Sequence, residues 1–246
     1  MPQKSVLLNR AIFSVRPYES RALTVLTTLF HHFSEAGSYE LFVRRGGAVI
    51  YRAAVLVGEA GAQQQLNLDL ATLAQERPRD CCDHDHGPRY TLGVNSVMGF
   101  YVSQGTGAYS VEIARTEHKE RRALDSAALI PAGDLFAVTL VRPGVYRAVE
   151  EQSGAEAQIR VAHPDPKSYR KGEVTLITFG GKEFKPKRAE IVSGHSVLFR
   201  CEAPARIRVE LVDAAETGTR PKPGTRFTVR RSGPPAAPKS GKKSSG

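Results

Sequence analysis

The sequence predicts an all-β protein made of two consecutive antiparallel β-sandwich units followed by a disordered basic tail. Three observations predict this class: short runs of alternating apolar and polar residues, glycine and proline between the runs, and a change of composition near the C-terminal end. We expect the first sandwich over 1–120, the second over 121–215 and the tail over 216–246. Within the tail, at least 232–246 is too rich in Pro, Ala, Lys, Ser and Gly to bury a core, which predicts disorder.

The first unit shows the strand pattern most clearly around a pair of glycines. Residues 37–45 and 48–57 are strand-like runs on either side of Gly46-Gly47. Paired glycines supply the positive φ angles that a two-residue turn requires, so we expect a β-hairpin. Residues 6–30 also alternate and favour strands, although 23–33 is long enough for a helix.

The remainder of the first unit contains further short elements. Residues 63–70 alternate polar and apolar side chains and predict a strand, and 70–75 predicts a short helical turn. A polar loop is expected over 76–89, and the strand pattern resumes over 90–102 and 108–113.

A charged segment over 118–126 marks the expected boundary with the second unit. The last strand of that unit alternates cleanly over 205–212. Ile207, Val209 and Leu211 should face inward there, with charged residues between them facing out.

One local motif recurs three times, as Gly37-Ser38-Tyr39, Gly107-Ala108-Tyr109 and Gly144-Val145-Tyr146. Each motif precedes a strand-like run. We interpret the glycine as a tight corner and the tyrosine as a cap whose hydroxyl bonds to backbone. The recurrence suggests related sandwiches in the two parts of the chain.

Two segments of the second unit resemble the cupredoxin-like fold. Phe184-Lys185-Pro186, followed by 190–192 and 194–199, is similar to the opening pattern of that family, and 142–146 is similar to its Pro-Gly-x-Tyr corner. The resemblance implies a cupredoxin- or immunoglobulin-like sandwich. It does not imply electron transfer by copper, because no Cys or His follows Tyr146 where the family's copper ligands would lie.

Charge is unevenly distributed along the chain. The formal net charge is +10, and subtracting the eight basic residues of 217–246, which contains no acid, leaves +2 for 1–216. We therefore expect only weak electrostatic contact of the tail with acidic partners. The sequence has no signal-peptide pattern and no apolar run long enough to span a membrane, which predicts a cytoplasmic protein.

The densest group of potential metal ligands is Asp80-Cys81-Cys82-Asp83-His84-Asp85-His86. Cys82, His84 and His86 are the candidate ligands, and zinc or copper is the metal that such donors take. The spacing contains no Cys-x-x-Cys pair, so a polar surface loop is the alternative interpretation.

The sequence predicts a non-catalytic binding or assembly module that presents loops and sheet edges to a protein partner or to another copy of itself. No catalytic residue is assigned. One alternative is a metal-binding sandwich that uses the Cys81–His86 cluster. A second is an enzyme whose site forms only in three dimensions, from His31 or His118 with distant acids. Of His31 and His32, one should pack against a sheet and the other meet water, and Glu150-Glu151 is interpreted as solvated charge at a turn.

Overall fold

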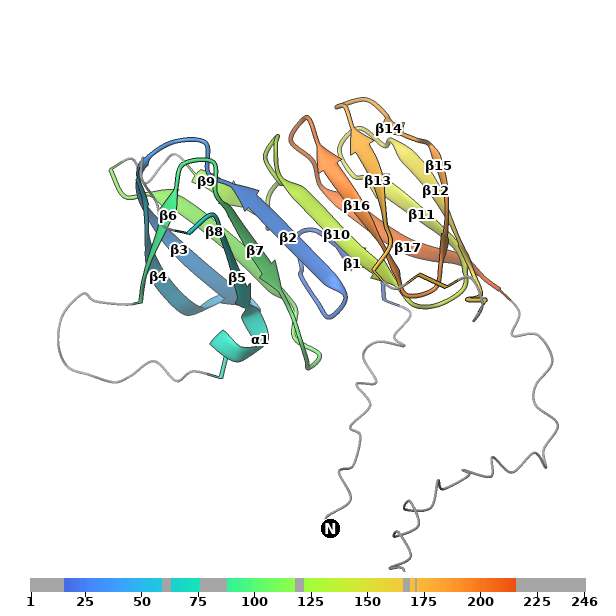
Figure 1. Ribbon diagram of the computed structural model, residues 1–246, viewed down its shortest axis with the longest axis horizontal. Helices are drawn as coiled ribbons and strands as arrows, with labels where there is room; N and C mark the ends of the chain where they lie inside the picture. The colour runs from blue at the N-terminus through green and yellow to red at the C-terminus, as the bar shows by residue number, and fades with distance from the viewer. Residues whose placement is uncertain are drawn as a thin grey trace, which may run out of the picture. The chain divides into compact units, whose positions relative to one another are not determined.

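The computed structural model describes residues 16–58, 63–75, 88–117, 122–165, 169–170 and 172–215. This part of the chain is all β, as the sequence predicts (Figure 1): its strands form three sheets, and its helix α1 (Leu70–Leu73) is a single turn. The tail expected over 216–246, including its disorder, lies outside the described residues.

The strands follow one another with short connections. In chain order they are β1 (Tyr18–Glu19), β2 (Thr27–His32), β3 (Gly37–Arg45), β4 (Ala48–Gly58), β5 (Gln65–Asp69), β6 (Arg89–Gly93), β7 (Val97–Tyr101), β8 (Tyr109–Arg115), β9 (Arg122–Asp125), β10 (Leu135–Leu140), β11 (Gly144–Glu150), β12 (Glu156–Ala162), β13 (Val174–Phe179), β14 (Phe184–Lys185), β15 (Arg188–Val192), β16 (His195–Cys201) and β17 (Ile207–Ala214).

A seven-stranded central sheet, in the order β14-β13-β16-β10-β2-β7-β5, runs through both expected sandwich units. An N-terminal sheet, β6-β4-β3-β8-β9, packs on the part of it formed by β2, β7 and β5. A C-terminal sheet, β1-β17-β11-β12-β15, packs on the part formed by β10, β16, β13 and β14 (Figure 1). Strands on both sides of the expected 120/121 boundary therefore share one sheet.

The strand pairing of the N-terminal half recurs in the C-terminal half. In the first half β2 pairs with β7, β7 with β5, β3 with β4 and β8, and β4 with β6. In the second half β10 pairs with β16, β16 with β13, β11 with β12 and β17, and β12 with β15. Even the parallel pairings correspond, since β4–β6 matches β12–β15 and β5–β7 matches β13–β16. The two halves thus repeat one topology.

The two halves meet where β2 and β10 pair in antiparallel fashion at the middle of the central sheet. Leu29 lies directly opposite Phe136. The flanking pairs are Thr28 with Ala137 and Phe30 with Leu135. Moving one residue forward along β2 corresponds to moving one residue backward along β10, because the strands are antiparallel. An approximate twofold axis that relates the two halves therefore passes between Leu29 and Phe136.

The tyrosine corners occupy equivalent places in the two halves. The hydroxyls of Tyr39 and Tyr146 each donate a hydrogen bond of 2.9 Å to the carbonyl oxygen four residues upstream. Gly37 and Gly144 lie two residues before these tyrosines and have φ angles of +154° and +149°. Residues other than glycine rarely adopt such angles. The structural role predicted for this motif is confirmed at these two of its three positions. At the third position, Gly107 does not have a positive φ angle.

Each half donates its leading strand to the other half. Strand β1 begins the N-terminal half but pairs with β17, and β9 begins the C-terminal half but pairs with β8. Matching serines follow these strands: Ser20 Oγ accepts a hydrogen bond from Ile207 N at 3.1 Å, and Ser126 Oγ accepts one from Val111 N at 2.8 Å. The exchanged strands tie the two halves together.

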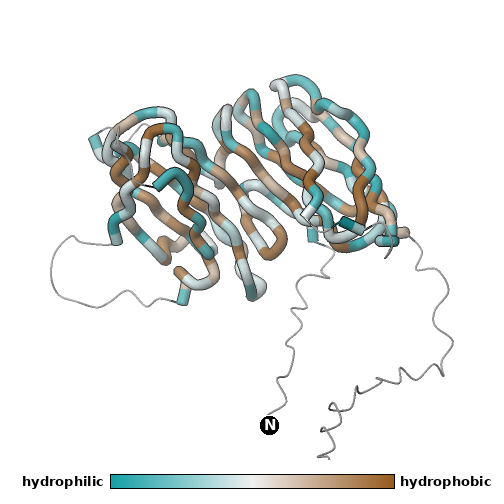
Figure 2. The backbone as a smooth tube through the Cα atoms, in the orientation of Figure 1, coloured by the Kyte–Doolittle hydropathy of each residue, from teal (hydrophilic) through white to brown (hydrophobic). Residues whose placement is uncertain are grey.

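Alternation of side chains along the strands builds the cores. Apolar and polar positions alternate along the tube of Figure 2, and β12 has the burial pattern of a strand with one inward and one outward face. The predicted hairpin turn is present at Gly46 and Gly47, whose φ angles are +57° and +84°. Phenylalanine supplies the largest fully buried side chains, namely Phe33, Phe100, Phe136, Phe179, Phe184 and Phe199.

Candidate functional site

The predicted metal ligands Cys82, His84 and His86 lie outside the described residues, as does His118. Within the described ranges, no group of three or more His, Cys, Asp or Glu side chains is arranged to hold a metal ion. Zinc or copper binding by the Cys81–His86 cluster therefore stays a prediction.

The structure contains a cavity of about 220 Å³ beside the end of β2. Its walls come from the end of β2 and the following turn, from β3, β8 and β9, and from the loop before β10. The lining residues are His31, His32, Phe33, Ser34, Glu35, Tyr39, Arg115, Arg122, Ala123, Pro131, Ala132 and Asp134. We call this cavity the His31 pocket.

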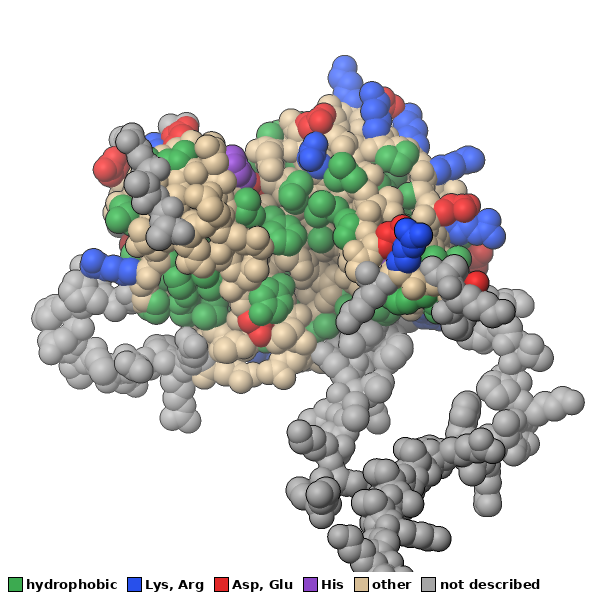
Figure 3. All heavy atoms as spheres, viewed as in Figure 1, with side chains coloured by type: hydrophobic (Ala, Val, Ile, Leu, Met, Phe, Trp, Pro, Cys, Tyr) green, Lys and Arg blue, Asp and Glu red, His purple; other side chains and the backbone are tan. Residues whose placement is uncertain are grey.

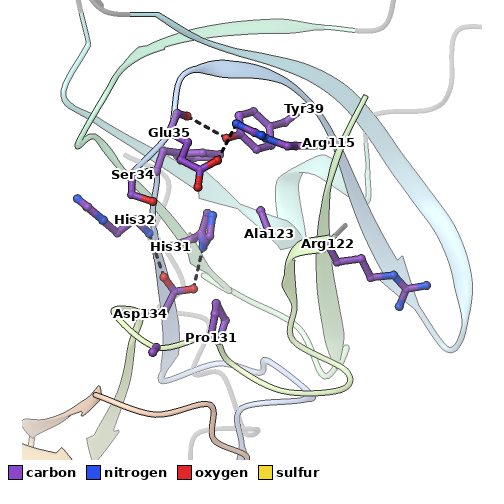
Figure 4. Close-up of a pocket in the computed structure, with 12 residues that line it drawn as sticks. His31, His32, Ser34, Glu35, Tyr39, Arg115, Arg122, Ala123, Pro131 and Asp134 are labelled. Atoms are coloured by element: carbon purple, nitrogen blue, oxygen red, sulfur yellow. Dashed lines mark hydrogen bonds and ion pairs between the residues drawn. The ribbon is translucent and has the colours of Figure 1, made fainter. Parts of the chain in front are cut away.

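A buried histidine–aspartate pair forms the floor of the His31 pocket (Figure 4). His31 Nδ1 lies 2.8 Å from Asp134 Oδ2, and the two residues are only 5% and 2% exposed. They are separated by 103 positions in the sequence. The other carboxylate oxygen, Oδ1, accepts a hydrogen bond of 3.0 Å from the backbone N–H of His32.

Strand alternation places the two adjacent histidines on opposite faces of β2. His31 packs edge-on against Phe33, with ring centroids 4.7 Å apart, whereas His32 is exposed. The prediction that one histidine packs inside and the other meets water is confirmed. Figure 4 shows His32 turned away from His31.

An ion pair forms the opposite wall of the His31 pocket. Arg115 Nη2 lies 2.8 Å from Glu35 Oε2 and donates a hydrogen bond of 3.0 Å to Ala36 O. The guanidinium also lies over the ring of Tyr39, 5.6 Å from its centroid. The neighbouring Tyr39 and, to a smaller extent, Glu35 raise the pKa of Arg115, so this side chain stays cationic.

Arg122 lies at the edge of the pocket and is engaged elsewhere. Its guanidinium pairs with Glu112 at 3.3 Å and with Asp125. In Figure 4 its side chain extends away from His31. The groups that converge on the pocket are therefore His31, Asp134, Glu35 and Arg115.

The bonding of the pair determines which part of His31 is left for a ligand. An ionised carboxylate can only accept hydrogen bonds, so Nδ1 carries the hydrogen and donates to Asp134. The second ring nitrogen, Nε2, is then the atom with which His31 can take up a proton or bond to a ligand. This pairing of His31 with a distant acid is the kind of arrangement that the enzyme alternative requires.

Sequence reasoning identified His31 but missed Asp134, Arg115 and Glu35. Alternation along a strand indicates which face a side chain occupies but does not indicate its partner on another strand. The only available signal for Asp134 was an acidic residue beside the first apolar position of a strand, at Gly133-Asp134-Leu135.

One carboxylate was placed wrongly from the sequence. Glu150 was interpreted as solvated charge, but it is 1% exposed. Its oxygens accept hydrogen bonds from Ser153 N at 2.7 Å, Gln152 N at 3.1 Å and Arg206 N at 2.9 Å. The backbone N–H groups of Gln152 and Ser153, in the turn after β11, point at the Glu150 carboxylate. The carboxylate is therefore buried with hydrogen-bond donors around it.

Two further buried groups lie outside the His31 pocket. Burial, with a smaller effect from the nearby carboxylates of Asp134 and Glu150, raises the pKa of the Cys201 thiol to about 12. His195 is the first residue of β16 and is 4% exposed, with the ring of Tyr169 5.1 Å away. Cys201 is therefore a thiol within a core at neutral pH.

The outer face of the central sheet is rich in apolar side chains and poor in charge (Figure 3). The alternate positions that face outward on β13, β16, β10 and β2 are partly or fully exposed. Their apolar members are Val174, Leu176, Leu198, Leu135, Ala137 and Phe30. Arg200 is the charged residue among the outward positions of β16. We call the outer side of the whole seven-stranded sheet, which includes these positions, the central-sheet face.

No protein-family model, curated protein or solved structure matches this chain, so the resemblance to cupredoxins stays a prediction. Among the residues placed by the structure, no helix is long and apolar enough to cross a membrane.

Proposed function

We propose that this protein is a non-catalytic binding or assembly module that presents the surface of its sandwiches to a protein partner. The observation that supports this proposal is the central-sheet face, which extends over strands of both halves. Val174 and Leu176 on β13 are 55% and 41% exposed, and Tyr101 on β7 is 37% exposed. Large exposed apolar patches on soluble proteins commonly mark interaction sites.

The extent of this face suits a protein rather than a small molecule. Seven strands about 4.8 Å apart, with about five residues rising about 3.3 Å each, span roughly 30 by 17 Å. Two such surfaces in contact approach the lower limit of about 1,200 Å² of total buried area that specific interfaces need. Within the face, the Phe30 ring lies beside Gly99, where an added Cβ atom would be 3.1 Å from the ring.

Charged substitutions on the central-sheet face test this proposal. We expect Ala137→Glu combined with Leu176→Glu to abolish association, because a buried unpaired carboxylate is costly at an interface. The matched control is Leu56→Glu, which places the same charge at a 53% exposed leucine on the outer side of β4. Association is measured by sedimentation velocity for self-assembly and by quantitative capture of a partner for other proteins. Equal association of all three proteins would refute the proposal.

The His31–Asp134 pair favours a second candidate function, an enzyme in which His31 acts as a general base. A neutral imidazole with Nδ1–H bonded to a carboxylate has the orientation that proton abstraction requires. The test is a screen of hydrolytic substrates with the wild-type protein and with His31→Gln. A reaction that His31→Gln slows by less than tenfold would argue against this role.

A further inference from the structure

The His31 pocket interrupts the repeat that relates the two halves. The central pair of the repeat is Leu29 and Phe136. His31 lies two residues after Leu29, so it corresponds to Val138, which lies two residues after Phe136. In the same way Asp134, two residues before Phe136, corresponds to Thr27, two residues before Leu29. At one end of the β2–β10 ladder Val138 lies opposite Thr27. At the equivalent end stand His31 and Asp134, joined by their side chains.

The wall of the pocket that contains Arg115 also differs from the equivalent place in the other half. Each corner tyrosine has a partner on the neighbouring strand: Tyr39 lies opposite Arg115, and Tyr146 lies opposite Leu211. The guanidinium of Arg115 therefore stands where the other half has an aliphatic side chain. Three ionisable groups of the pocket, those of His31, Asp134 and Arg115, therefore have uncharged counterparts in the other half, whereas Glu35 corresponds to Arg142.

The equivalent position of the other half is built without these ionisable groups. Thr27 and Val138 are buried, with 1% and 0% exposure, and they complete the ladder at the equivalent position without any charge. Burial of a carboxylate and an imidazole carries a desolvation cost that apolar residues of similar size avoid. A costly pair at a position where an apolar one suffices indicates a role other than folding.

The bonds already made in the pocket define the ligand that remains possible. Both oxygens of Asp134 accept hydrogen bonds, and Glu35 is paired with Arg115. A guanidinium has five N–H donors, and an imidazolium has a second N–H at Nε2. The polar groups left to bind a ligand are therefore mainly donors, which calls for a ligand with oxygen acceptors.

We propose that the His31 pocket binds a small oxyanion, a carboxylate or a phosphate group, between His31 and Arg115. On binding, His31 takes up a proton, so that one N–H donates to Asp134 and the other to the anion. Affinity therefore increases as the pH falls. The other charged or titratable side chains around His31 are Asp134, Glu35, Arg115, His32 and Arg122. This site is separate from the central-sheet face, and neither proposal depends on the other.

The test is an NMR titration of the full-length protein that follows the imidazole and backbone signals of His31. The probes are sodium acetate and sodium phosphate, which distinguish the two kinds of oxyanion, with sodium chloride and acetamide as negative controls. We expect saturable shifts with at least one oxyanion, stronger at pH 6 than at pH 8. Absence of a saturable shift with both oxyanions would overturn the proposal.

The variants replace residues of the pocket by the residues found at the equivalent positions of the repeat. His31→Val with Asp134→Thr installs the residues of the equivalent ladder end, and Arg115→Leu installs the equivalent of Leu211. Both should fold and should bind the anion at least tenfold more weakly. The control, Arg147→Leu, removes a carboxylate-paired arginine from β11, outside the pocket, and should bind normally.

Two results with the double variant would overturn the proposal. One is unchanged anion affinity, since binding would then not involve His31. The other is a large fall in its midpoint of thermal unfolding, since the pair would then serve the fold itself.

Discussion

Leu29 and Phe136 face each other across the middle of the central sheet, and the two halves of the protein are arranged symmetrically about this pair. Both side chains are fully buried, with 0% exposure. This pair at the centre of the repeat thus lies within a single cluster of buried apolar residues that extends through both halves.

The exchange of leading strands predicts that the two halves assemble even when the chain is cut between them. A break within 118–121, between β8 and β9, leaves each fragment with a strand that belongs to the other fragment's sheet. We expect co-expressed fragments 1–119 and 120–246 to copurify in a 1:1 ratio with the far-ultraviolet circular dichroism of the intact protein. The matched comparison is the N-terminal fragment without β1. Two folded fragments that do not associate would contradict this prediction.

Glu150 should make stability depend on pH. Burial alone would raise its pKa, but hydrogen bonds from Arg206, Ser153 and Gln152 outweigh that effect and hold the pKa below its ordinary value. A carboxylate with a lowered pKa in the folded state stabilises the protein above its unfolded pKa of about 4.3, and this contribution is lost as the pH falls through the folded value.

We expect Glu150→Gln to lower the free energy of unfolding at pH 7 by about 1–3 kcal/mol, because backbone N–H groups lose an acceptor. Urea unfolding at pH 7 and at pH 3 measures the effect, which should shrink at the lower pH. Glu156→Gln, at a carboxylate that is 54% exposed, is the control. An equal loss of stability at both pH values would show that the charge of Glu150 is not involved.

The tyrosine corners should contribute similarly in the two halves. Tyr39→Phe and Tyr146→Phe each remove one hydroxyl that donates at 2.9 Å to a carbonyl oxygen. We expect a loss of about 0.5–1.5 kcal/mol in each case, as is usual for a hydrogen bond. Chemical denaturation of both variants checks this. A loss confined to one variant would mean that the corners are equivalent in geometry but not in energy.

Cys201 should be inert in the folded protein. Its pKa is raised to about 12 by burial, and reagents need the exposed thiolate. We expect iodoacetamide at pH 8 to leave Cys201 unmodified until the protein is unfolded. Peptide mapping after alkylation distinguishes it from Cys81 and Cys82. Rapid labelling of Cys201 without denaturant would show that its core opens readily.

Local features of the fold could be predicted from the sequence because their causes are local. The glycines at 46 and 47 form the turn that their flexibility permits, and Gly-x-Tyr forms corners at Tyr39 and Tyr146. Alternation correctly placed Ile207 and Val209 in a core.

Relations between distant segments could not be predicted in this way. A strand pattern does not indicate which strand is its neighbour, so the exchange of β1 and β9 has no signal in the sequence. For the same reason Asp134 could not be matched with His31. Glu150 was misplaced because a charged residue at a turn is usually solvated, and only the folded turn shows that its N–H groups surround the carboxylate.

The pairing of β1 with β17 also brings the first and last described residues near each other. Tyr18 lies opposite Val209, and the last described residue, Ala215, is six positions further on, about 20 Å away along an extended strand. A linker of moderate length could therefore join the two ends, and new termini could be opened between β8 and β9. Such a circular permutant would carry β9 through β17 first and β1 through β8 last, with the same sheets and the same pocket.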